Sequence, residues 1–127
     1  MDMNLKRNLS AALVIFAWLW LPVGSFAATG FVKGTAEWVR IHDATVIPSW
    51  SPPRFWFSLN GVTSAGGCPT WVGGRVLFVS ESKEAYMTVL SAQMTGKEIA
   101  VYWDDAQQVA GWCRAGYITI GDPPPLF

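Results

Sequence analysis

From residue 31 onward, apolar and polar residues alternate with a period of two along several short segments, which is the pattern of half-buried β-strands. In the segment 54–60, Phe55, Phe57 and Leu59 fall on one face and Trp56 falls on the other. We expect a β-bulge at Gly34, where the long first strand bends. The segments predicted to be strands are 31–47, 54–60, 75–79, 97–103 and 112–120.

Proline and glycine mark the connections between these segments. The segment 47–53 carries three prolines together with Trp50. It is predicted to be an exposed loop, because proline removes the backbone donors that a central strand needs. A glycine-containing loop is expected at 64–69 and a polar loop at 104–108. The last strand is expected to have two faces, one formed by Trp112, Ile118 and Ile120 and the other by Cys113 and Tyr117.

One helix is predicted between the third and fourth strands. Ser80 is its candidate N-cap, and Gly96 ends it. Apolar side chains fill an arc of about 220° around this helix, whereas packing against one core needs a stripe little more than 100° wide. The excess is centred on three residues: Met87, Leu90 and Met94. A neighbouring subunit, or the next strand or loop of the same chain, would cover this face, and the sequence leaves both open.

The order of three strands, one helix and two strands is typical of a five-stranded barrel of the OB type, with the helix between strands 3 and 4. We therefore predict a mainly β fold with one helix. The predicted domain spans residues 28–121, and a proline-rich tail follows at 122–127. No internal repeat points to a second domain.

The first 27 residues have the layout of a secretory signal peptide. Lys6 and Arg7 precede an apolar run over 9–21, and small residues precede a cleavage site after Ala27. An uncleaved anchor is the alternative, but this thirteen-residue run falls short of the roughly 20 residues that span a bilayer. We expect cleavage after Ala27, a secreted or periplasmic bacterial protein, and no membrane insertion once the leader is removed.

Charge and cysteine content narrow the function further. Beyond residue 27 there are seven basic and eight acidic residues, a net charge of −1. This balance argues against a nucleic-acid partner, which requires a basic surface. Cys68 and Cys113 are the only cysteines in the chain. An oxidising compartment favours a disulfide between them.

Several of these segments together resemble a known family. They are 54–59, the approach to Cys68, 82–93, 96–102 and Cys113. The pattern resembles small exported bacterial proteins of the type of the binding subunit of subtilase cytotoxin, and it covers most of residues 30–120. The resemblance implies an OB fold, a disulfide and, in the toxin members, a ring of five subunits that binds glycans. This chain departs from the toxin subunit in its proline- and tryptophan-bearing first loop and its single cysteine pair.

No catalytic or metal-binding pattern accompanies this fold. The single histidine, His42, is followed by Asp43, but zinc needs further ligands at set spacing. The pair Asp104–Asp105 lacks the other oxygen ligands of a calcium loop and is predicted to be a solvated turn. No serine lies in a nucleophile motif. We therefore expect neither an enzyme nor a cofactor or metal site.

Aromatic side chains are the remaining candidates for function. Six tryptophans follow residue 27, and two of them, Trp50 and Trp71, lie in loops rich in proline or glycine. OB folds use such loop and face positions to bind oligosaccharides. The predicted ligand-binding residues are Trp50, Arg54, Trp56 and Trp71. Alternatively, these aromatics cover the barrel ends or a seam between subunits, since aromatics are also enriched at interfaces.

The sequence thus predicts an exported, non-enzymatic binding module that recognises a glycan or a protein surface. A homo-oligomer, pentameric if toxin-like, is the form that the resemblance implies, with Met87, Leu90 and Met94 at its interface. The alternative is a periplasmic structural or accessory protein that binds a partner polypeptide.

Overall fold

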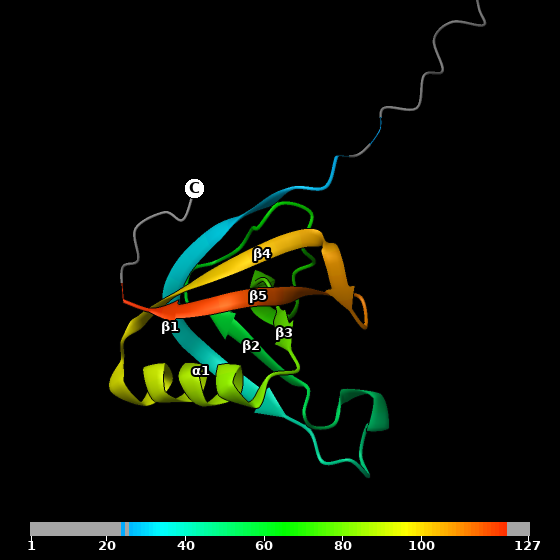
Figure 1. Cartoon of the computed structure of the whole chain (residues 1–127), viewed down its shortest axis with the longest axis vertical. Helices are drawn as coiled ribbons and strands as arrows, with labels where there is room; N and C mark the ends of the chain where they lie inside the picture. Colours follow the sequence, from blue (N-terminus) through cyan, green and yellow to red (C-terminus); the bar gives the residue numbers. More distant parts are fainter. Residues whose placement is uncertain (1–23, 25, 122–127) are drawn as a thin grey trace, which may run out of the picture.

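The computed structural model describes Gly24 and residues 26–121, so the predicted signal peptide lies almost entirely outside the described residues, and the tail 122–127 lies wholly outside them. Figure 1 shows a small barrel with one α-helix across its lower end. The elements, in chain order, are β1 (Thr29–Ile41), η2 (Pro48–Trp50), β2 (Phe55–Leu59), η3 (Val72–Gly74), β3 (Phe78–Ser80), α1 (Lys83–Thr95), β4 (Glu98–Val109) and β5 (Trp112–Ile120).

The five strands close into a ring in the order β1-β2-β3-β5-β4. Only the β3–β5 pair is parallel. The ring closes because β1 pairs with β4 along residues 29–35 and with β2 along residues 36–41. The predicted fold, a mainly β ring resembling an OB barrel with one helix between strands 3 and 4, is confirmed. No helix within the described residues is long and apolar enough to cross a membrane.

The bulge in β1 lies at Glu37, so the prediction of a bulge at Gly34 is wrong. Pairing with β2 is regular from Trp38 onward and shifts between Ala36 and Trp38. This extra residue reverses the alternation, because Ala36 packs into the barrel before it and Val39 packs into the barrel after it. Gly34 has a different role: a Cβ there would lie 3.0 Å from the carbonyl oxygen of Asn60, where β1 passes the end of β2.

A second shift in register, opposite Tyr102 and Trp103 of β4, falls at Gly116 in β5. Cys113 and Ala115 face the core before it, and Ile118 packs against the same core after it. The predicted common face of Trp112 and Ile118 is therefore wrong, because the two side chains pack against different clusters.

The barrel interior holds the main core. Each strand contributes alternate side chains, and across one layer Val39, Phe57, Phe78 and Cys113 lie opposite one another on adjacent strands. Helix α1 covers one end of this core with Val89 and Ala92, both fully buried. A disulfide between Cys68 and Cys113 joins the loop after β2 to the start of β5, as predicted.

Some predicted boundaries are wrong. The first strand ends at Ile41. The segment 104–108 continues β4: Asp104 pairs with Thr29 of β1 and Gln108 pairs with Cys113 of β5, across an irregular stretch of the β4–β5 ladder. The N-cap of α1 is Ser82, whose hydroxyl accepts a hydrogen bond from the N–H of Ala85 at 3.1 Å; Ser80 instead ends β3. Gly96 ends the helix in the left-handed conformation, as predicted.

Candidate functional site

A second apolar cluster lies on the outer face of β2 and β3. Its buried members include Trp56 from β2 and Val79 from β3, which point away from the main core. We call its five tryptophans the tryptophan face: Trp38, Trp50, Trp56, Trp71 and Trp112. The outer surface of strands 2 and 3 is where OB folds bind oligosaccharides and oligonucleotides.

Trp56 forms the floor of the tryptophan face. Its side chain is fully buried, and the ring of Trp50 lies over it with 4.2 Å between centroids and 30° between planes. Trp50 is held there by η2, in the proline-rich segment before the cis Pro52–Pro53 bond. Trp56 does point away from the main core, as predicted, but its burial leaves it no direct contact with a ligand at the surface.

Arg54 is tied to neighbouring protein groups. Its guanidinium donates to the Glu81 carboxylate, at 2.7 Å from Nη2 to Oε1, and to the carbonyl of Ser49. Arg114 also donates to Glu81, at 3.3 Å. Arg54 therefore positions the loop that carries Trp50, and its charge is balanced by Glu81.

A solvent-open hollow of about 430 Å³ lies beside the covered part of this face, between Trp38 and Trp71. The two indoles meet edge to face, with 5.4 Å between centroids. The guanidinium carbon of Arg40 lies 4.6 Å from the Trp71 ring centroid. We call this the Trp38–Trp71 hollow; its lining residues are Trp38, Val39, Arg40, Ile41, Trp71 and Val72.

Within the described part of the chain, Arg40 has no ion-pair partner. Of the two acidic residues nearest to it in the sequence, Glu37 pairs with Arg75 at 2.9 Å, and the Asp43 carboxylate accepts hydrogen bonds from Thr45. A guanidinium against an indole ring gains cation–π stabilisation and keeps its N–H donors available. The hollow therefore offers aromatic surface together with one uncompensated cation.

Of the predicted ligand-binding residues, the structure places only Trp71 in this hollow. Sequence reasoning missed Trp38 and Arg40. They reach the outer face because the bulge at Glu37 reverses the alternation of β1. A glutamate does not mark a bulge in the sequence, so the outward position of Trp38 and Arg40 became evident only from the β1–β2 register.

A second, smaller hollow lies between β4 and β5. Tyr102 and Tyr117 stack in it with 4.9 Å between centroids, and Phe31 meets both rings edge-on. Burial raises the pKa of Tyr117 above its ordinary value, so its hydroxyl stays neutral in the physiological range. Arg114 also lines this hollow, and it pairs with Glu81.

The part of the apolar arc of α1 that exceeds one core-facing stripe is only partly covered. Met87 is 60% exposed, Met94 is 80% exposed and Leu90 is half-buried. Among the described residues no other strand or loop covers the two methionines. A neighbouring subunit at this face stays a prediction.

The described residues contain no cluster of three or more side chains suited to a metal ion. The His42 ring meets Trp50 edge-on at 5.2 Å between centroids. The Thr45 hydroxyl and N–H both donate to the Asp43 carboxylate and lower its pKa. Asp104 and Asp105 lie in β4 and not in a solvated turn.

Comparisons of the chain with protein-family models, with curated proteins and with solved structures found no match.

Proposed function

We propose that this chain is an exported, non-enzymatic binding module that takes an acidic carbohydrate in the Trp38–Trp71 hollow. The observation that carries the proposal is the guanidinium of Arg40, which is held against an indole in an open hollow and has no ion-pair partner among residues 26–121. Its volume falls within the range of about 300–1,000 Å³ that is common for small-ligand sites.

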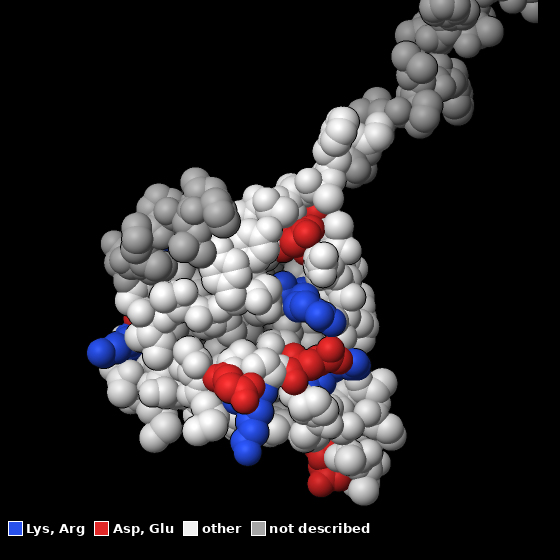
Figure 2. All heavy atoms as spheres, in the orientation of Figure 1, with Lys and Arg blue, Asp and Glu red and all other residues white. Residues whose placement is uncertain are grey.

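The chemistry of the hollow fits such a ligand. The apolar face of a sugar ring packs on indole, and a carboxylate on the sugar accepts charge-assisted hydrogen bonds from Arg40. A polyphosphate is disfavoured, because nucleic-acid binding needs a cationic groove. On the face shown in Figure 2, basic and acidic side chains lie close together and form no extended basic stripe.

A polypeptide partner is the second candidate, and a specific observation favours it. At the rim of the hollow Ile41 is 50% exposed and Val72 is 68% exposed. Contiguous apolar surface of this kind is typical of protein-binding sites. The chain would then be a periplasmic structural or accessory protein.

A ring-forming homo-oligomer, pentameric if the resemblance to toxin binding subunits holds, is part of the first proposal. The uncovered methionines Met87 and Met94 support it. Light scattering of the oxidised protein spanning residues 28–127 gives its solution mass. A mass near five times the monomer supports the ring, and a monomeric mass rejects it for the isolated protein.

The ligand is tested on an array of neutral and uronic-acid glycans. We expect Trp71→Ala to weaken binding at least about thirtyfold, as for a central aromatic contact worth about 2 kcal/mol. Arg40→Gln should weaken the binding of acidic glycans about tenfold and leave the binding of neutral glycans unchanged. Matched controls are Phe31→Ala, an exposed aromatic of the other hollow, and Lys97→Gln, an exposed cation.

No glycan binding by the wild type, or equal losses with the control variants, rejects the carbohydrate proposal. If instead a bacterial polypeptide binds in a way that Val72→Asp abolishes and Arg40→Gln does not, the second candidate is supported.

A further inference from the structure

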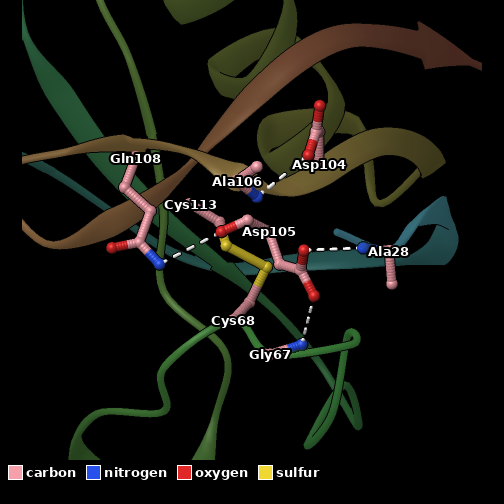
Figure 3. The surroundings of a disulfide bond; sticks show 8 residues. All are labelled: Ala28, Gly67, Cys68, Asp104, Asp105, Ala106, Gln108 and Cys113. Carbon is pink, nitrogen blue, oxygen red and sulfur yellow. Dashed lines mark hydrogen bonds between the residues drawn. A yellow bond between two sulfur atoms is a disulfide. The ribbon is translucent and has the colours of Figure 1, made fainter. Parts of the chain in front are cut away.

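Asp105 connects three segments that are far apart in the sequence. Its Oδ1 accepts a hydrogen bond from the N–H of Ala28 at 2.8 Å, and its Oδ2 accepts one from the N–H of Gly67 at 2.8 Å (Figure 3). The N–H of Asp105 in turn donates to the carbonyl of Ala28 at 3.0 Å. One carboxylate of β4 therefore joins the start of β1 to the loop that leads to Cys68.

The Ala28 nitrogen has a second significance. The leader is predicted to be cleaved after Ala27, which makes this same nitrogen the α-amine of the processed chain. In hydrolysis of the Ala27–Ala28 bond, water supplies a hydroxyl to the Ala27 carbonyl carbon and a proton to the Ala28 nitrogen. The amine takes a further proton from solvent and is mostly an ammonium at neutral pH.

We propose that removal of the leader converts the Ala28–Asp105 peptide hydrogen bond into an ion pair between the α-ammonium and the carboxylate, a contact that only the processed chain makes. This inference rests on the export part of the proposed function and is independent of the ligand in the Trp38–Trp71 hollow.

The backbone geometry keeps the new ammonium in place. Thr29 pairs with Asp104 at the first position of the β1–β4 ladder, and the Asp105 N–H holds the Ala28 carbonyl. Neither contact involves the residues that cleavage removes. The ammonium therefore stays beside Oδ1 and gains a full charge there, which makes the hydrogen bond charge-assisted.

The same corner of the fold holds the disulfide. Gly67, which donates to Asp105, directly precedes Cys68, and Cys68 is bonded to Cys113 (Figure 3). Leader cleavage and thiol oxidation both accompany export. Cleavage affects this loop through Asp105, and oxidation affects it through Cys68. The fold thus reaches its full stability only after export.

The test compares two N-terminal forms of the chain starting at Ala28, one with a free amine and one N-acetylated. The acetylated form keeps the donor N–H but carries no charge, as in the unprocessed chain. Both forms are made with the disulfide intact, in the wild type and in Asp105→Asn. Asp104→Asn is the matched control, because the Asp104 carboxylate accepts from the N–H of Ala106 and not from Ala28.

We expect acetylation to raise the unfolding equilibrium constant roughly two- to fivefold, the size of an exposed ion pair. The same change is expected in Asp104→Asn and none in Asp105→Asn. The wild-type difference should shrink at 1 M salt, where the Debye length falls to about 3 Å. Amide exchange at Gly67 should quicken on acetylation, because the neutral Ala28 N–H holds the Asp105 carboxylate, the acceptor of the Gly67 N–H, less firmly than the ammonium does.

Equal stability of the two wild-type forms, or an equal effect of acetylation in Asp105→Asn, overturns the proposal. So does mass spectrometry of the exported protein that shows a first residue other than Ala28. None of these results alters glycan binding at Arg40 and Trp71, so the two proposals fail separately.

Discussion

The stacked pair of Trp50 and Trp56 allows the packing of the tryptophan face to be tested quantitatively. Trp56 is fully buried, and Trp50, which is half-buried, lies over it at 4.2 Å between ring centroids. The perturbations are Trp56→Ala, Trp50→Ala and the double variant. Trp56→Ala should lower the free energy of unfolding more than Trp50→Ala does, and the two losses should not be additive.

The magnitudes follow from the burial of each ring. A buried aromatic side chain removes up to about 250 Å² from water, which at about 25 cal/mol per Å² gives about 6 kcal/mol for Trp56. The compactness of the unfolded chain lowers this to about 4–5 kcal/mol, near the range measured for such truncations. Trp50 buries nearer to about 150 Å², and the same correction leaves about 2–3 kcal/mol.

The assay is urea unfolding followed by far-ultraviolet circular dichroism, with the disulfide intact. We expect the double variant to lose about 0.5–1.5 kcal/mol less than the sum of the single losses, because the ring–ring contact is counted twice in that sum. Trp56→Phe serves if Trp56→Ala does not fold. Phe31→Ala combined with the Trp56 variant is the additive control, since Phe31 packs on the tyrosines of the other hollow.

Losses at Trp50 and Trp56 that add within about 0.3 kcal/mol would refute the stacking. A loss below about 1 kcal/mol for Trp56→Ala would contradict its burial, because a surface change of this kind is nearly neutral.

Three further perturbations test the fold. Replacing Cys68 and Cys113 by alanine should lower the unfolding free energy by up to about 4 kcal/mol in urea titration, because the disulfide links residues that are 45 apart in the sequence. An unchanged urea midpoint would contradict this expectation. Gly66→Ala should destabilise by about 1–3 kcal/mol more than Gly74→Ala in thermal melts. Both glycines have positive φ, but only at Gly66 does an added Cβ meet another side chain, at 2.5 Å; equal losses would show that strain alone acts. Deleting Glu37 should abolish the native circular dichroism, whereas Glu37→Gln, which breaks only its surface ion pair, should cost about 1 kcal/mol or less.

The fold could be predicted from the sequence because its strands are amphipathic and its turns are marked. Alternation over Phe55, Phe57 and Leu59 located β2, and Gly96 located the end of α1. The extension of β4 through 104–108 could not be predicted, since those polar side chains give no hydrophobic alternation. There backbone pairing at the two ends of the segment, of Asp104 with β1 and of Gln108 with β5, outweighs the weak strand preference of aspartate.

The candidate site was less predictable, because the two bulges decide which side chains reach the surface. A continuous strand from Ala36 would have placed Trp38 and Arg40 inside the barrel. Glu37 gives no signal for a bulge. Gly116 does carry the glycine signal, but Gly34 carries the same signal and has no bulge, so glycine alone does not locate one. For the same reason Trp112 and Ile118 could not be assigned to opposite sides of β5 from the sequence.

Tryptophan content alone did not identify a site, because most of the indoles on this surface form a second small core. The proposed ligand contact differs from the structural contacts in whether the nearby arginine already has an ion-pair partner. Arg54 and Arg40 both lie near a tryptophan in the sequence, but Glu81 neutralises Arg54. A ligand carboxylate would have to displace Glu81 to reach Arg54, whereas at Arg40 it meets no competing anion among the described residues. The proposed anionic ligand is therefore expected to bind at Arg40, three residues beyond Glu37, where the alternation of β1 reverses.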